Sequence, residues 1–253
     1  MHESAATTWS KDRVFSLVVA IALPLVVYLL SVPRPIYRFM IPAFFILVGL
    51  TQIFAWSRYV EFVGQRRWAM IRSICFYVSW FSIFFLVPGE FRFLYALASV
   101  PVLFLGQAFI LYAGETVLVT HTMLSAVGVF MGAAAAEFYF KAGSTLLTLA
   151  VFGFNLLLCL ATYAFVPQSH KVRLLSSLVV ALLATEFYTI TLFLPFHYTV
   201  LGFLSFLVFY VLWLLTYYWQ FGVLTKRRVQ FYLAIALLLA ALVLLATPWR
   251  IVP

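Results

Sequence analysis

Long runs of apolar residues follow one another along the whole chain, and most charged residues lie in the short segments between them. The hydrocarbon core of a bilayer is about 30 Å thick, so a helix that crosses it needs about 20 predominantly apolar residues. Several runs reach that length. The predicted spans are 14–32, 36–56, 69–88, 92–113, 116–140, 144–166, 174–194, 198–220 and 229–248.

These runs predict helices. Backbone polar groups inside a bilayer must be hydrogen-bonded within the protein, so a spanning segment is an α-helix or a barrel strand. The runs lack the alternation of apolar and polar residues that barrel strands show. We expect an all-α, polytopic transmembrane helical bundle of about nine helices, forming a single domain over residues 1–253. Its least certain division separates the fourth span from the fifth, where only Gly114 and Glu115 interrupt the apolar run.

The composition excludes an ordinary soluble domain. The chain is 66% hydrophobic and 9% charged, whereas a soluble domain is about 45–50% apolar and about 25% charged. A soluble fold of this length could not cover so much apolar surface with polar groups.

The distribution of Lys and Arg predicts the orientation, because cytoplasmic loops carry an excess of these residues. With the N-terminus in the cytoplasm, eleven of the sixteen Lys and Arg residues fall in cytoplasmic segments and five in outer segments. The reverse orientation would invert this bias. Nine crossings then place the C-terminus outside.

The formal net charge of +9 follows from the same distribution. The basic residues lie between spans, so they predict contact with an anionic lipid leaflet on the cytoplasmic side, at about 1 kcal/mol per residue, and no nucleic acid partner. The expected location is the cell membrane, or the inner membrane if the organism is bacterial. Besides lipids, the expected partners are another membrane protein or further copies of this chain.

No cofactor or metal site is predicted. Cys75 and Cys159 lie inside apolar runs, where a small buried side chain is the simplest interpretation. The predicted spans hold no pair of His for haem and no three-residue set for zinc. The sequence also lacks the motifs of common hydrolases and phosphate-binding enzymes.

Prolines distinguish the two halves of the chain. Pro24, Pro42 and Pro101 fall inside the first, second and fourth spans, whereas spans five to eight have no interior proline. Because proline removes a backbone donor and bends a helix, we expect bent helices in the N-terminal half and straighter ones in the C-terminal half.

The fifth span carries small residues three or four positions apart. They are Ser125, Gly128, Gly132 and Ala136. Small residues let two helix backbones approach closely. Packing within the chain is the preferred interpretation and a dimer interface is the alternative, because eight other helices are available. In either case the fifth helix should be central.

Glu186 stands alone inside the seventh span, with no basic residue close to it in sequence. Ionisable residues within spans are costly, so each is a functional hypothesis. Glu186 is interpreted either as a protonatable or cation-binding group, or as a protonated carboxyl that hydrogen-bonds another helix and fixes packing only.

Four further polar residues are candidates for the same site. Glu137 lies near the outer end of the fifth span, where Lys141 follows at a spacing that pairs the two on one helix face. His121 lies near the inner end of that span, and a buried His is usually a hydrogen-bonding group. Gln107 and Asn155 could join a network with either glutamate, or simply link helices.

Three functions follow, in decreasing order of preference. The first is a membrane protein that binds or transports a small or lipidic ligand around an intramembrane carboxylate. The second is a non-catalytic structural or accessory subunit of a larger membrane complex, because no catalytic motif is present. The third is an intramembrane enzyme acting on a lipid, with Glu186 or Glu137 as general base. A lone carboxylate without a placed nucleophile or metal is weak evidence for catalysis, so an enzyme is the least favoured.

Overall fold

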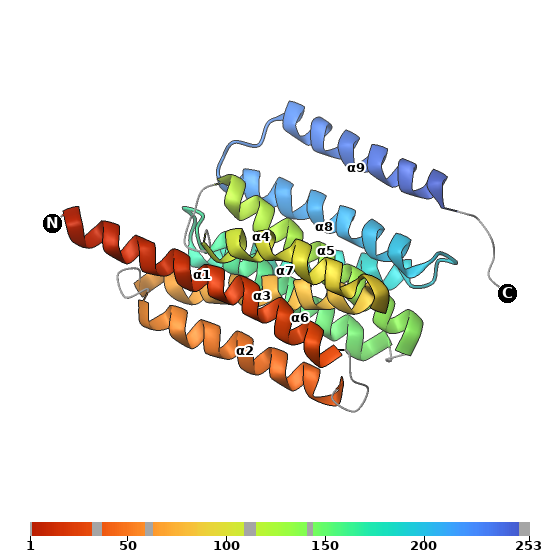
Figure 1. The fold of residues 1–253 in the computed structure, drawn as a ribbon. Helices are drawn as coiled ribbons and strands as arrows, with labels where there is room; N and C mark the ends of the chain where they lie inside the picture. The colour runs from red at the N-terminus through yellow and green to blue at the C-terminus, as the bar shows by residue number, and fades with distance from the viewer. Residues whose placement is uncertain (1, 32–36, 59–62, 109–114, 141–143, 248–253) are drawn as a thin grey trace.

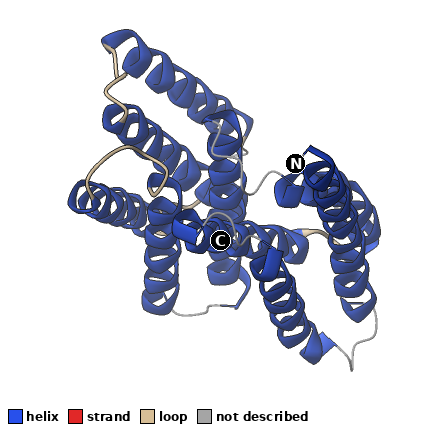
Figure 2. Ribbon diagram, turned by 90° about the vertical axis from the view of Figure 1, so that its left-hand side faces the viewer, coloured by secondary structure: helices blue, strands red, loops and turns tan. Residues whose placement is uncertain are grey.

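The computed structural model describes residues 2–31, 37–58, 63–108, 115–140 and 144–247 (Figure 1). Over these residues the chain is helical throughout, with turns and loops between the helices and no strand (Figure 2). The helices are α1 (His2–Ser31), α2 (Tyr37–Arg58), α3 (Val63–Leu86), the short 3-10 helix η1 (Gly89–Phe91), α4 (Arg92–Ala108), α5 (Glu115–Phe140), α6 (Ser144–Tyr163), α7 (His170–Thr191), α8 (Tyr198–Gln220) and α9 (Lys226–Ala246).

Seven of the described helices are long and apolar enough to cross a membrane, namely α1 and α4 to α9. The all-α prediction is confirmed. For these seven helices, the predicted length and apolar composition of a membrane span are confirmed as well. α2 contributes a shorter described apolar stretch, Ile41–Ile53. α3 is more polar because it carries Arg67, Arg72 and several Ser residues. Spanning by α2 and α3, and the orientation of the chain, stay predictions.

The helix boundaries differ from the predicted spans mainly at polar ends. α1 begins at His2, well before the apolar run, because polar residues extend a helix without belonging to the membrane. The structure separates the fourth helix from the fifth, since α4 ends at Ala108 and α5 begins at Glu115. The predicted turn at Gly114 lies outside the described residues.

Local sequence explains where the last three helices begin. Ser169 and Thr225 precede α7 and α9, and their side chains accept hydrogen bonds from the backbone N–H groups of Val172 and Arg228. Such caps satisfy donors that have no partner within the helix. His197 caps α8 in the same way through Thr199.

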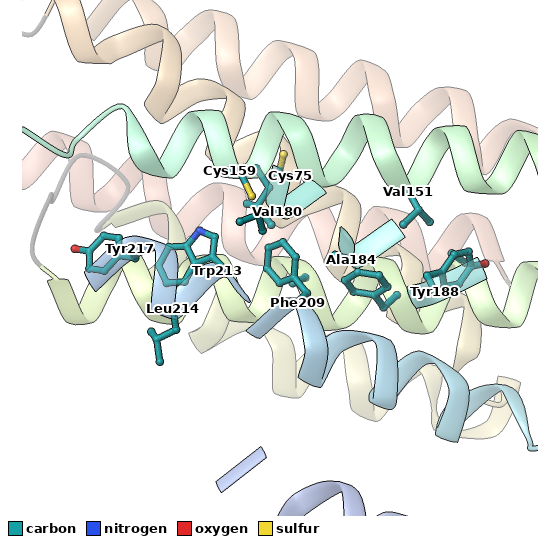
Figure 3. Packing of buried hydrophobic residues seen from close by; sticks show 14 of the residues in the cluster. Cys75, Val151, Cys159, Val180, Ala184, Tyr188, Phe209, Trp213, Leu214 and Tyr217 are labelled. Carbon is teal, nitrogen blue, oxygen red and sulfur yellow. The ribbon is translucent and has the colours of Figure 1, made fainter. Parts of the chain in front are cut away.

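The buried side chains form two clusters that meet at α3. We call the first the N-terminal cluster. It joins α1, α2 and α4 to the aromatic face of α3, which consists of Phe76, Tyr77, Trp80, Phe81 and Phe84. The second, the C-terminal cluster, joins α5, α6, α7 and α8 to the opposite side of α3 at Cys75. Figure 3 shows the C-terminal cluster running along the bundle from Tyr217 at one end to Tyr188 at the other.

Small residues set the distance between α3 and α5, the most extensively packed pair of helices. A Cβ atom at Gly128 would collide with the Ser79 backbone carbonyl, and one at Gly132 would lie 2.6 Å from the Ser82 Cβ. The Ser79 hydroxyl donates to the Leu124 carbonyl of α5 at 2.7 Å. The structure therefore places the small-residue row of α5 against α3 of the same chain. Ser125 in this row is fully buried and bonds back to the His121 carbonyl.

α9 lies at the edge of the bundle beside α8 (Figure 1). Among its residues only Ala236 is buried. Its first turns are attached by the Tyr232 hydroxyl, which donates to the Tyr218 hydroxyl at 3.0 Å, and by Arg228, whose guanidinium lies 4.9 Å from the Tyr218 ring. Leu237 and Leu245 beyond these contacts are largely exposed.

Candidate functional site

The structure separates Glu186 from the other candidate residues. Its side chain is exposed on the outer surface of α7. The residues one turn before and after it on that face, Leu182 and Ile190, are exposed as well. α7 turns its opposite face, with Ala184, Thr185 and Tyr188, into the C-terminal cluster. Glu186 therefore does not line the interior of the bundle.

Glu137 instead approaches the interior. It lies in the last turns of α5 and is half-buried, and its Oε2 atom is buried without a hydrogen-bond partner among the described residues. The carboxyl group interacts electrostatically with the Tyr188 hydroxyl but does not hydrogen-bond to it. The predicted pairing with Lys141 falls outside the described residues.

Two hydroxyl groups of α7 share the buried side with this carboxyl. Tyr188 is fully buried and Thr185 nearly so, and neither hydroxyl has a hydrogen-bond partner in the described part of the chain. The two residues lie three positions apart, so their side chains occupy one helix face. The Tyr188 ring lies 6.1 Å from the Phe130 ring of α5. This ring contact lies two turns before Glu137 on α5.

Asn155 supplies the fourth polar group. It has 0% exposure, and neither its Oδ1 nor its Nδ2 atom has a partner among the described residues. The Thr148 and Thr189 hydroxyls, 3.4 Å apart, fix the level at which α6 crosses α7. Asn155 lies seven residues after Thr148, and Thr185 lies four residues before Thr189. Because α6 and α7 run in opposite directions and each residue adds 1.5 Å, Asn155 and Thr185 lie on the same side of that level, about 4 Å apart along the helix axes.

We call Glu137, Tyr188, Thr185 and Asn155 the α5–α7 polar row. α6 packs against both α5 and α7, whereas α5 and α7 are not an extensively packed pair. Buried polar side chains nearly always have partners, so each of these atoms calls for an explanation such as a ligand or an ordered water. The row offers one carboxylate, two hydroxyls and one amide. These are oxygen ligands with a single negative charge, which suit a small cation.

His121 has a structural explanation. Its Nε2 lies 2.9 Å from the Gly106 carbonyl oxygen, so Nε2 donates to the last turn of α4, where carbonyls lack partners within the helix. Its ring lies 4.5 Å from the Phe76 ring of α3. His121 therefore joins α4 to α5 where the two clusters meet. Gln107 is the residue after Gly106, and its side chain lies outside the described residues.

Arg72 of α3 is a buried charge and is not among the site residues predicted from the sequence. It has 0% exposure, and its guanidinium lies 5.1 Å from the Phe165 ring. It also interacts electrostatically with His121. Cys75, Ser79 and Ser82 follow Arg72 at intervals of three or four residues, so all four share one helix face. This spacing is the feature of the sequence that indicates the inward position of Arg72. That row marks the side of α3 that packs on α5 and α6.

The deep tryptophan of α8 has no free donor. The Trp213 Nε1 group donates to the Thr162 hydroxyl of α6 at 3.1 Å, and the Tyr163 hydroxyl donates to the Trp213 carbonyl at 3.2 Å. These bonds join α6 to α8 and leave Trp213 a packing role. Figure 3 shows the sulfur atoms of Cys75 and Cys159 side by side in the same core, and both thiols are free.

Among the described residues, no group of three His, Cys, Asp or Glu could hold a metal ion. No protein-family model, no curated protein and no solved structure matches this chain. The fold by itself defines a class: the apolar helices fit a multi-pass α-helical membrane protein.

Proposed function

We propose that the protein binds a small cationic solute, an alkali-metal ion or a protonated amine, at the α5–α7 polar row within the membrane. The observation that carries this proposal is the buried Oε2 atom of Glu137, which has no hydrogen-bond partner among the described residues. A carboxylate in a low-dielectric interior needs a compensating charge, and a bound cation supplies it.

The arrangement also supports access from one side. Glu137 is only half-buried, whereas Thr185 and Asn155 are deeper in the bundle. A cation would meet the carboxylate first and exchange its water for the hydroxyl and amide oxygens of the row. Binding is the step supported by these contacts, and transport would require a second opening beyond Asn155.

A salt series tests the proposal. The protein in lipid nanodiscs would be unfolded by heat in the chlorides of sodium, potassium, ammonium, methylammonium and choline at equal ionic strength. A ligand that binds the folded state raises its stability by about 2.7 kcal/mol at a hundredfold excess over Kd. We expect a saturable rise with one cation over choline, lost in Glu137→Gln and weakened about tenfold in Tyr188→Phe.

Glu186→Gln is the matched control, because it makes the same change on the exposed face of α7 and should leave the cation effect intact. Sodium or potassium as the active salt would identify a metal ion, and methylammonium an amine. Equal stability in all five salts, or an unchanged response of Glu137→Gln, would refute the proposal. Flux of the active cation into proteoliposomes then separates transport from binding alone.

A second candidate function, an accessory subunit of a membrane complex, is favoured by a different observation. α9 is attached to the bundle by its first turns, and most of its described side chains are exposed. A helix with so little intramolecular packing leaves surface for contact with another membrane protein.

A further inference from the structure

The outer face of α7 carries an apolar stripe with a single carboxylate in it. Its members lie three or four residues apart and are all exposed: Leu175, Val179, Leu182, Glu186 and Ile190. We call this the α7 stripe. α7 packs on α6 and α8 through other residues, so nothing among the described residues covers the stripe.

The carboxylate lies within the apolar surface and not at its edge. After Glu186 the chain presents Ile190, which is 60% exposed, and Phe193, which is 85% exposed. Along the chain after Glu186, the next charged or titratable side chain other than the inward-facing Tyr188 is His197, which caps α8. The Glu186 side chain would therefore have to extend past exposed apolar residues to reach water.

Glu186 makes no hydrogen bond and no ion pair within the described part of the chain. Glu186 lies five residues before the end of α7, within its spanning length. Charged side chains inside a spanning helix are costly, by up to about 2.5–3.5 kcal/mol at the centre on insertion scales. In membrane proteins such groups pair with one another or with backbone carbonyls. The stripe thus combines an apolar packing surface with a charge that the described chain does not pair.

We infer that the α7 stripe is the docking surface for a transmembrane helix of a different protein, and that this helix presents a Lys or Arg side chain to Glu186. Charge complementarity selects this partner. The surrounding Leu, Val and Ile side chains pack against its apolar residues, and the pair of opposite charges fixes the register of the two helices.

The described residues of a second copy of this chain do not provide that complement. A symmetric dimer places the same surface of both copies in contact, so two Glu186 carboxylates would face each other. On the same helix, Lys171 lies fifteen positions before Glu186, roughly 22 Å away along the axis. Arg92 follows the end of α3, and its side chain donates to the Val87 carbonyl and lies over the Phe84 ring of its own chain.

Crosslinking in the natural membrane tests the inference. A photoreactive residue would replace Ile190, one turn from Glu186 on the stripe, in the full-length chain. The expected result is a covalent adduct whose mapped peptide lies in a transmembrane segment of another protein, within one turn of a Lys or Arg. An adduct to a second copy of this chain, or to lipid only, would overturn the inference.

Charge variants provide the second measurement. Glu186→Lys and Glu186→Gln should each lower the amount of crosslinked partner roughly tenfold or more, because removing one member of a buried charge pair leaves the other unpaired. Glu90→Gln, which removes an exposed carboxylate from η1, should leave the yield unchanged. Replacing the partner's basic residue by Glu should restore the Glu186→Lys complex.

A crosslinking yield unaffected by either Glu186 variant would also overturn the inference. The folding of each variant would be checked by its thermal unfolding in nanodiscs without partner, which separates loss of binding from loss of fold. The inference does not rest on the proposed cation site, because Glu137 is unchanged in all of these variants.

Discussion

The two clusters hold their helices together in different ways. In the N-terminal cluster, large rings interlock: Phe44 of α2 stacks on Phe81 of α3 with ring centroids 4.0 Å apart, and Trp80 stacks on Tyr95 of α4. In the C-terminal cluster, glycines bring backbones together. A Cβ atom at Gly202 of α8 would lie 2.9 Å from the Met131 Cα of α5.

This difference determines where polar groups can be buried. Lipid solvates apolar side chains, so helices associate in a bilayer through close packing and hydrogen bonds. Rings fill most of the space between α1, α2, α3 and α4, and hydrogen bonds such as that from Gln52 Nε2 to the Ser73 hydroxyl join these helices as well. Close backbones in the C-terminal cluster allow short polar side chains to meet, and the α5–α7 polar row lies there.

Adding a methyl group between α3 and α5 should have the largest effect. Gly128→Ala would press a Cβ atom against the Ser79 backbone, and overpacking of this kind costs about 3 kcal/mol. The free energy of unfolding in mixed detergent micelles measures it. Gly153→Ala in α6 is the control, because nothing lies within 4 Å of its Cβ position. Equal stability of the two variants would show that α3 and α5 do not approach as closely as described.

Removing a ring from the N-terminal cluster should have the next largest effect. Phe44→Ala deletes a fully buried ring and should lower the free energy of unfolding by about 2 kcal/mol. The loss is smaller than in a soluble core because lipid solvates the ring once the helices separate. The same unfolding assay applies. Phe45→Ala, which removes the exposed neighbouring ring, should change stability by less than about 0.5 kcal/mol. A larger loss for Phe45→Ala would place α2 in the opposite rotation.

Deleting a hydrogen bond from the C-terminal cluster should cost less. Thr162→Val removes the acceptor of the Trp213 indole N–H, and interhelical hydrogen bonds in membranes contribute about 0.6 kcal/mol on average and up to about 1.7. Thr145→Val on the exposed side of α6 is the control. Trp213 fluorescence should change with Thr162→Val alone. A loss above that of Phe44→Ala would mean that hydrogen bonds, not packing, dominate this cluster.

The smallest effect is expected at α9. Tyr232→Phe removes the hydroxyl that donates to Tyr218, at a cost of about 0.5 kcal/mol. Because α9 contacts only α8 extensively, the loss should loosen α9 without changing global unfolding. Distances between spin labels on α8 and α9 should broaden in this variant and stay narrow in Phe231→Leu. A global loss equal to that of Thr162→Val would show that α9 unfolds together with the bundle.

Sequence reasoning identified the polar candidates but could not group them. Glu137 and Glu186 both stand in an apolar helix and both carry the sequence Glu-Phe-Tyr. The structure buries an oxygen of the first and exposes the second. Both helices are apolar on nearly every face, so no amphipathic pattern shows which side turns inward. Tyr188 and Thr185 were not singled out for the same reason.

The sequence by itself determined the features that depend on composition and local spacing. Apolar length set the helices, Pro24, Pro42 and Pro101 fell inside α1, α2 and α4, and the small residues of α5 predicted a close helix contact. These features depend on bilayer thickness and backbone chemistry, which act on each segment separately.

Only the tertiary structure decided which faces meet. It made α3, one of the less apolar helices, the element shared by both clusters, and it turned Glu137 inward and Glu186 outward. In water, the apolar side of a helix identifies its buried face. In lipid both faces are apolar, so the rotation of each helix follows from the fit of side chains on neighbouring helices, which are distant in sequence.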